Sequence, residues 1–513
     1  MNRNISAQDM LNEELNTLIT SSSGGKLQNM ASEDTNVHDR PANTTISARH
    51  HSQYENSNQD TKPPRLLFSK RCFVTALLFV GYVLLTIGAR MLGIVIIDMT
   101  YLSGNHTTVD VARYDWDSPT ISLVLNMFWY GFLFSPFSGY ISQKFGAAVT
   151  FGGSMILSGV LFFANPFGLK VHFYLFLLIR GLVGLIQGIG MSSMSGVIAN
   201  WIPKAERAKL MGFIVNGIHS GNVLSFAFCG FLTQHFGWPM SFYGTGAVSV
   251  IWAIVFLIFV TNDPSQDKWI SQKELAYLQS TIARTPSKNN HSPYKAIFLS
   301  PPFWALFLCK FAYAWTNVLV VGYCPMYIND VIRADINLVG YIASIPSFAI
   351  IFILPVTGIL MDHCQKRTKI EDTKVHKIII CNGFVISSAL YLLVAYVDNF
   401  IVSIVCFVLI NVIISYNRVI YEVLTVNIAP NHSSLISGLT LFGQTIGIIV
   451  AQSAIGYIVQ NHKASEWDIC FCCAAAVLTF TALIFGLFGS SKPQPWSVSP
   501  PAQAADQTSK PQD

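Results

Sequence analysis

Long apolar runs separated by short polar turns recur from Cys72 to about residue 489, and they constrain the fold of this chain more than any other feature. Each run is long enough to cross the roughly 30 Å of hydrocarbon in a bilayer. At that length only helices satisfy every backbone group in lipid, so the sequence predicts an all-α membrane protein. The composition agrees, because 12% of the residues are charged, and a typical soluble domain has about twice that share. Twelve spans are predicted, at residues 71–99, 118–143, 147–166, 171–200, 209–235, 240–261, 298–328, 338–361, 376–397, 399–428, 434–460 and 467–489.

Polar stretches divide the chain into parts. Residues 1–68 are rich in Ser, Asn, Asp and Thr, a composition that cannot bury a core, and we predict a disordered cytoplasmic tail. Residues 263–297 form the longest internal polar segment, which we predict to be a cytoplasmic linker between six spans and six spans. The predicted organisation is therefore a tail, an N-terminal half at 69–262, the linker, a C-terminal half at 298–490 and a second cytoplasmic tail at 491–513.

The loops and the first tail carry signals for orientation and location. Lysine and arginine are concentrated in the loops on the side of the N-terminus, which predicts that both termini are cytoplasmic. The first outer loop then contains Asn105 in the sequon "NHT", a predicted glycosylation site. In the tail, Glu14 precedes Leu18 and Ile19 at the spacing of an acidic dileucine sorting signal, with a chance match as the alternative. The predicted location is an endosomal, lysosomal or synaptic-type vesicle membrane, or the plasma membrane.

A glycine-led polar turn follows the second span of each half. The first copy is "GYISQKFGAA", which begins at Gly139, and the second is "GILMDHCQKR", which begins at Gly358. A motif that recurs at matching places in two six-helix halves indicates an internal repeat. Paired halves around a central cavity are typical of transporters.

Both turns resemble the loop motif of the major facilitator superfamily, in which a glycine is followed by an acid and then by basic residues. The gating residues that this resemblance implies are Gly139, Lys144, Gly358, Asp362, Lys366 and Arg367. The first copy departs from the pattern, because Gln143 stands where the acid is expected and Ala148 where a base is expected. The departure weakens the ion-pair lock expected in the N-terminal half.

Longer stretches narrow the resemblance to the anion–cation symporter group, which includes sialin, the vesicular glutamate transporters and the type I sodium-phosphate transporters. They include "LGIVIIDM", "IPKAERAKLMGF", "FGWPMSFYGTG", "DPSQDKWISQKELAYL", "SPPFWALFLCKFAYAWTNVLVVGYCPMYINDV" and "NIAPNHSSLISG". The resemblance covers most of residues 70–490. It implies the major facilitator fold, with twelve helices in two pseudo-symmetric halves, and transport of a small anion by alternating access.

Polar side chains inside the predicted spans are the candidates for the anion site, because a charge at mid-span costs about 2.5–3.5 kcal/mol on insertion scales. Arg180 and Gln187 are two helical turns apart and therefore share one face of the fourth span. Arg180 is interpreted as a ligand of an anionic substrate, with a structural role as the alternative. The resemblance supports the first interpretation, because the family also has an arginine at this position. Sialin-like relatives carry a glutamate, implied to handle the coupled proton, where this chain has Gln187, which cannot titrate.

Further candidates lie in other spans. In the first span, the position of the family's substrate arginine is occupied by Ala89, and Arg90 is the next residue. Arg90 could therefore line the cavity or point in another direction. Arg418 and Glu422 are an i, i+4 pair in the tenth span; they are interpreted either as a structural pair or as substrate cation and coupling group. His219 is a second coupling candidate, with hydrogen-bonded packing as the alternative.

Aromatic and amide side chains complete the predicted set. Tyr130, Tyr313 and Asn317 are interpreted as cavity-wall residues that bind substrate, or else as interfacial anchors and packing residues.

The sequence thus predicts a secondary active or voltage-driven transporter of small organic anions. Carboxylates such as sialate, glutamate or urate are preferred to phosphate as substrates. The alternatives are a ligand-binding receptor or scaffold with a transporter fold and, third, a chloride channel. The expected partners are the anion, a coupled proton or sodium ion and the lipid bilayer; a monomer is expected. No catalytic motif, metal-ligand spacing, cofactor motif or nucleic-acid signal is found, so an enzyme is not expected.

Overall fold

The computed structural model describes residues 69–100, 114–282, 293–327, 331, 348, 350–356, 359, 371–397, 399–460 and 463–497. The long helices before the linker are α3 (Lys70–Met99), α4 (Ser118–Phe132), α5 (Ser138–Phe145), α6 (Ala147–Val171), α7 (Phe173–Trp201), α8 (Arg207–Phe236) and α9 (Trp238–Phe259). The linker contains α10 (Gln272–Thr281) and α11 (Tyr294–Phe298). The helices after it are α12 (Pro301–Asn317), η6 (Val318–Tyr323), α13 (Cys324–Tyr327), α15 (Asp372–Tyr396), α16 (Phe400–Ile428), α17 (Ser433–Ile458) and α18 (Ala464–Phe488).

Within the described ranges, ten helical segments are long and apolar enough to cross a membrane. They correspond to ten of the predicted spans, and α4 with α5 forms one of them. The fifth predicted span is α8, a 30-residue helix that contains Asn216, His219 and Asn222 and is not among the ten. The eighth, residues 338–361, lies mostly outside the described residues. The protein is therefore a helical multi-pass membrane protein, and the count of twelve spans stays a prediction.

The seventh predicted span, residues 298–328, is divided into pieces. Pro301 begins α12, and after Asn317 the backbone continues as the π-helical segment η6. π-Helical turns are uncommon and are frequent at functional sites. The segment η6 is therefore a candidate for a binding function in this span.

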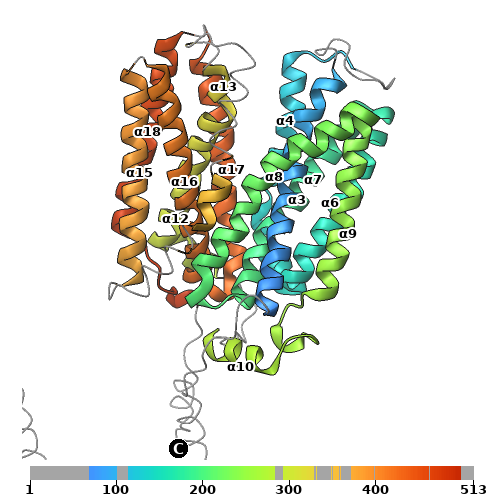
Figure 1. Cartoon of the computed structure of the whole chain (residues 1–513), viewed down its shortest axis with the longest axis vertical. Helices are drawn as coiled ribbons and strands as arrows, with labels where there is room; N and C mark the ends of the chain where they lie inside the picture. The colour runs from blue at the N-terminus through green and yellow to red at the C-terminus, as the bar shows by residue number, and fades with distance from the viewer. Residues whose placement is uncertain are drawn as a thin grey trace, which may run out of the picture. The chain divides into compact units, whose positions relative to one another are not determined.

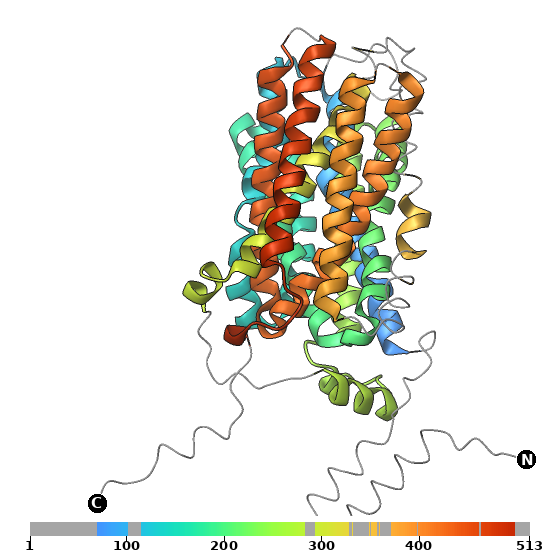
Figure 2. The ribbon, with the colours of Figure 1, turned by 90° about the vertical axis from the view of Figure 1, so that its left-hand side faces the viewer.

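The helices pack into two bundles, which Figures 1 and 2 show from two sides. In the first bundle α3 packs against α8, α6 against α7 and α9, and α4 against α7. In the second, α15 packs against α16 and α18, and α12 against α17 and α18. Each pairing buries apolar helix faces, and both bundles contribute to the buried apolar core.

The two bundles contact each other near the end that carries the linker helix α10, here named the linker end. Ser135 Oγ donates to the Gly438 carbonyl oxygen at 2.9 Å, and Ser138 Oγ donates to that of Ser434 at 3.1 Å. A Cβ atom on Gly438 would lie 2.5 Å from the Ser135 carbonyl oxygen, so glycine is required for this approach. These small side chains let η3 (Ser135–Phe137) and α5 pack closely on α17.

Charged residues also join the bundles at the linker end. Lys204 pairs with Asp372 across the halves at 2.8 Å. Within the second half, Lys492 pairs with Glu371 at 2.6 Å, and its hydrogen bond holds the pKa of the Glu371 carboxyl below the usual value. Both pairs are substantially exposed to solvent, so each contributes little to stability.

The linker helix α10 is attached to the first half by a buried ionic network. Glu274 accepts hydrogen bonds from the backbone N–H groups of Lys70 and Arg71, at 2.9 and 3.0 Å, and from Arg71 Nε at 3.1 Å. Arg71 also pairs with Glu206 in the turn between α7 and α8. A carboxylate at the first turn of α3 interacts favourably with the helix dipole, so this network fixes the linker against that helix.

Candidate functional site

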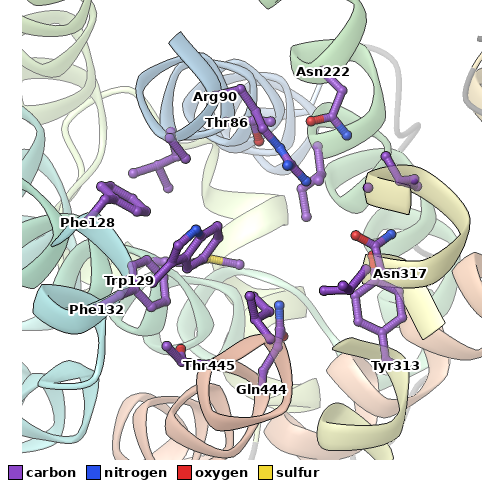
Figure 3. Close-up of a pocket in the computed structure, with 18 of the residues that line it drawn as sticks. Thr86, Arg90, Phe128, Trp129, Phe132, Asn222, Tyr313, Asn317, Gln444 and Thr445 are labelled. Atoms are coloured by element: carbon purple, nitrogen blue, oxygen red, sulfur yellow. The ribbon is translucent and has the colours of Figure 1, made fainter. Parts of the chain in front are cut away.

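A cavity lies between the two bundles, and both contribute to its wall. Its first-half residues come from α3, α4, α7 and α8, and its second-half residues come from α12, η6, α16 and α17. The polar side chains in the wall are those of Tyr82, Thr86, Arg90, Trp129, Gln187, His219, Asn222, Tyr313, Asn317, Tyr323, Arg418, Gln444, Thr445 and Gln452. Figure 3 shows several of them around the open space. The arrangement combines cations, amides and aromatic rings around one cavity.

Arg90 extends from α3 into this cavity (Figure 3). Its side chain is exposed there, although it lies deep in the helix bundle. Ala89 also lines the cavity, so the two residues together form this part of the wall. The structure thus gives Arg90 the cavity position that the sequence left open.

Arg418 reaches the cavity from α16 in the second half. Its guanidinium carbon lies 4.8 Å from the centre of the Tyr313 ring, a cation–π contact. Arg418 Nη2 is 4.0 Å from Glu422 Oε1, which is within ion-pair range but too long for a hydrogen bond. Arg418 Nε and Nη2 have no hydrogen-bond partner among the described residues. The cation is therefore buried and stacked on a ring, and its hydrogen-bonding capacity is only partly used by the described residues.

Glu422 has a second cationic neighbour that sequence reasoning missed. Lys310 Nζ on α12 donates a hydrogen bond to Glu422 Oε2 at 3.1 Å, and both side chains are almost completely buried. Lys310 is a charge in the middle of the apolar stretch "FLCKFAYAW", and that signal could have found it. Neither Lys310 nor Glu422 is among the described residues that line the cavity.

Arg180 and Gln187 share one face of α7, as their spacing predicts, but they have different surroundings. Gln187 lines the cavity, is 2% exposed, and neither of its amide atoms has a partner in the described part of the chain. Arg180 is 1% exposed and is not among the described lining residues. Its guanidinium stacks on Phe128 at 5.7 Å, and Phe128 itself lines the cavity. Arg180 therefore lies behind the wall.

Glycine in α7 explains why α4 can come so close to this helix. A Cβ atom on Gly184 would lie 2.0 Å from the Phe128 carbonyl oxygen, and one on Gly188 would lie 3.2 Å from that of Phe132. A side chain larger than that of glycine at either position would therefore push the two helices apart. The contact brings the aromatic residues of α4 against the cavity.

The coupling candidate His219 lines the cavity from α8, is 3% exposed, and its Nε2 has no partner in the ranges described. One turn earlier, Asn216 Nδ2 donates to the Ile351 carbonyl oxygen of the second half at 2.9 Å. This face of α8 thus contacts both the cavity and the opposite half.

Of the aromatic and amide candidates, Tyr313 and Asn317 line the cavity from α12. Tyr130 does not; it is 41% exposed, and its neighbour Trp129 lines the cavity instead. The amide residues Asn222 and Gln444, which the sequence did not single out, also belong to the wall (Figure 3). Each has a buried amide oxygen without a partner among the described residues.

The first copy of the gating motif lies at the linker end. A Cβ atom on Gly139 would lie 2.5 Å from Leu435 Cδ1 of α17, so this glycine is at an inter-half contact. Lys144 is exposed, and its Nζ lies 5.4 Å from the Phe145 ring centre. Several predicted residues fall outside the described residues, and they are Glu14, Leu18, Ile19, Asn105, Gly358, Asp362, Lys366 and Arg367. In the part that is described, no group of His, Cys, Asp and Glu side chains could hold a metal ion.

The chain matches the family model of the Major Facilitator Superfamily over residues 78–452. The match covers well over half of the chain, which therefore belongs to this superfamily. The membership confirms the predicted fold class.

Proteins with similar sequences indicate which members of the superfamily this chain resembles. Vesicular glutamate transporter 1 of Xenopus laevis is 27% identical over 416 residues, which cover 79% of this chain and 72% of that protein. Vesicular glutamate transporter 3 of Danio rerio is 27% identical over 440 residues, covering 83% of this chain and 74% of the relative. For human vesicular glutamate transporter 2 the identity is 26% over 416 residues, and the shares are 79% and 72%. These relatives confirm the resemblance to the anion–cation symporter group.

Solved structures share the fold at low sequence identity. The proton:xylose symporter XylE, bound to 6-bromo-6-deoxy-D-glucose, matches with a TM-score of 0.61 and 14% identity, covering 83% of this chain and 97% of that one. The human organic anion transporter MFSD10 (TETRAN) matches with a TM-score of 0.55 and 13% identity over 81% and 99% of the two chains. These structures show that the chain shares their fold, in agreement with the family match.

Proposed function

We propose that this protein is a transporter of small organic anions that binds its substrate between Arg90 and Arg418 and moves it by alternating access. The observation that carries the proposal is that these two arginines, one from each half, reach the same cavity. A ligand held by both would connect the two halves, and a transporter with paired halves requires a site at their interface.

The chemistry of the wall supports an anionic substrate. Guanidinium donates paired hydrogen bonds that fit a carboxylate or a phosphate, and two nitrogens of Arg418 have no hydrogen-bond partner in the described residues. Buried polar groups without partners are costly, so a ligand that satisfies them gains affinity. The amides of Gln187, Asn222 and Gln444 could then bind the neutral polar groups of the substrate.

Carboxylates are the substrates we favour, with glutamate as the first candidate because the relatives are named vesicular glutamate transporters. Sialate and urate follow, and phosphate is the last candidate. The relatives also support a vesicle membrane as the location. We place the linker end and both termini on the cytoplasmic side, in agreement with the concentration of lysine and arginine there.

The contacts between the halves at the linker end indicate which conformation of the transport cycle the protein adopts in this structure. Ser135, Ser138 and Gly438 hold the halves together at that end. With the linker end cytoplasmic, the cavity would open to the lumen or the outside and be closed to the cytosol. Transport requires these contacts to separate so that the substrate site can face the cytosol.

Membrane voltage acting on the anion is the driving force that we favour. Gln187 cannot carry a proton, and Glu422 is held by Lys310 in an ion pair. Each net charge moved across 100 mV is worth about 2.3 kcal/mol, which is enough for roughly fiftyfold accumulation. A coupled proton on Glu422 or His219, or a sodium ion, is the competing mechanism.

Uptake into liposomes that contain the purified protein tests the proposal. Radiolabelled glutamate, sialate, urate and phosphate would be offered under separately imposed voltage, pH and sodium gradients. We expect voltage-driven accumulation of at least one carboxylate without a pH gradient. Binding of an anion without any uptake would instead identify a receptor, single-channel currents would identify a channel, and neither binding nor uptake of the four anions would contradict the proposal.

A further inference from the structure

We infer that Lys310 is a positioning residue of the anion site, because it neutralises Glu422 and so leaves Arg418 available to the transported anion. The inference rests on the proposed function, since it concerns the availability of a substrate-binding arginine. Lys310 itself is completely buried and is not one of the described cavity residues, so it would act through its partner.

The distances within the cluster support this division of roles. Glu422 accepts its hydrogen bond from Lys310 at 3.1 Å, whereas the nearest Arg418 nitrogen stays 4.0 Å from the carboxylate. The partner of Glu422 is therefore the lysine of α12 and not the arginine one turn earlier on its own helix. Arg418 Nε and Nη2 have no hydrogen-bond partner in the described residues, and Arg418 is itself one of the residues that line the cavity.

Removal of the lysine would change the partner of the carboxylate. Glu422 would then have Arg418 as its neighbouring cation, on the same helix and at i, i+4 spacing. Closing the 4.0 Å gap to hydrogen-bond distance requires a movement of about 1 Å. A buried carboxylate without a counter-charge is strongly destabilising, so Glu422 and Arg418 would move together. The anion would then have to compete with Glu422 for Arg418.

Two tyrosine rings pack against the cations of this cluster. The Tyr313 ring supports the Arg418 guanidinium, and the Tyr421 ring lies 6.0 Å from Lys310 Nζ. The two rings meet edge to face with their centres 6.0 Å apart. Each cation thus has its own ring, and of the two cations only Lys310 is within hydrogen-bond distance of the Glu422 carboxylate.

The protein also offers a matched control. Lys492 and Glu371 form a second lysine–glutamate pair at 2.6 Å, but both side chains are substantially exposed and lie away from the cavity. Lys492→Met makes the same chemical change as Lys310→Met. It should leave transport unchanged.

The test compares KM and the maximum rate of radiolabelled glutamate, sialate, urate and phosphate uptake by the full-length protein in liposomes. We expect Lys310→Met to raise KM for the transported anion about tenfold or more, because Arg418 is captured by Glu422. Lys310→Met combined with Glu422→Gln should bring KM back to within about threefold of wild type, since no carboxylate remains to compete. Lys310→Arg, which keeps the cation, should stay near wild type.

A merely structural role for Lys310 would give a different pattern. It would lower the amount of folded transporter and hence the maximum rate, without raising KM. An unchanged KM in Lys310→Met, or a raised KM that persists in the double variant, would overturn the inference. If Lys310→Met does not fold, the double variant alone decides, because a KM near wild type supports the inference and a raised KM overturns it. Absence of anion binding and uptake by the wild type would overturn the proposed function as well.

Discussion

The two halves of the protein present arginine to the same cavity in different settings. In the first half, Arg90 extends into the open cavity, and none of the described cavity residues is acidic. In the second half, Arg418 is 3% exposed, stacks on Tyr313 and lies beside Glu422, which is itself paired with Lys310. One cation is exposed to the cavity, and the other is buried and stacked on a ring.

The difference suggests two tasks. A long arginine side chain that extends into a cavity can change its conformation to suit different anions. A buried arginine must be compensated, and its fixed orientation then selects for ligand geometry. We therefore expect the buried site to determine whether an anion is transported, and the exposed one to adjust its affinity.

The largest effect is expected for Arg418→Ala. Truncating one member of a buried charge cluster costs about 2–5 kcal/mol, so kcat/KM for anion uptake should fall about a hundredfold or more. Arg418→Lys should recover little of this loss, because an ammonium lacks the planar fork. Initial uptake rates at matched protein levels in liposomes measure it, and a variant within a few-fold of wild type would break the comparison.

A smaller effect is expected for Arg90→Ala. Its exposed guanidinium is replaceable in part by water, so we predict a rise in KM of about tenfold with little change in the maximum rate. Arg90→Lys should recover more activity than Arg418→Lys does. Equal behaviour of the two lysine variants in the same uptake assay would show that the halves do not differ in this way.

Gln187→Glu adds a carboxylate to the first-half wall, where the amide now lies without partners. At neutral pH the ionised form should repel the anion and raise KM about tenfold; protonation at acid pH should remove the repulsion. Uptake by this variant should thus increase as the pH falls, whereas wild type responds less. Uptake measured from pH 5 to pH 8 at constant voltage tests the prediction, and parallel pH profiles of the two proteins would refute it.

The smallest effect is expected for Arg180→Lys. Arg180 lies behind Phe128 and acts on the cavity through its charge, which lysine preserves. We predict kcat/KM within about threefold of wild type, in contrast to Arg418→Lys. A loss as large as that of Arg418→Lys would mean that Arg180 contacts the substrate directly in another conformation of the cycle.

The helical membrane fold could be predicted from the sequence because the cost of exposing backbone groups to lipid leaves few alternatives. The interruption of the seventh span was not predicted. The stretch from Val318 to Tyr323 is apolar, and an apolar composition does not distinguish an α-helix from a π-helix. Its contribution to the cavity wall appears only in three dimensions.

The candidate site was predicted in part, for a similar reason. Spacing within one helix identified Arg418 with Glu422 and the common face of Arg180 with Gln187. Spacing does not tell how far a side chain lies from the cavity. It therefore did not distinguish a residue that lines the cavity from one that lies behind an aromatic ring. It also could not reveal Lys310 as the partner of Glu422, because the two residues are 112 positions apart in the chain.

Equilibrium binding of a radiolabelled anion to the purified protein is the most direct test of the central claim that both halves hold the substrate. The probe is whichever of glutamate, sialate, urate and phosphate is taken up best by the wild type, and the comparison is with Arg90→Ala, Arg418→Ala and the variant that combines them. Two groups that hold one ligand together are coupled, so the combined variant should bind little worse than Arg418→Ala alone. Full-strength binding by Arg418→Ala, or losses from the two single changes that simply add, would contradict a site shared between the halves.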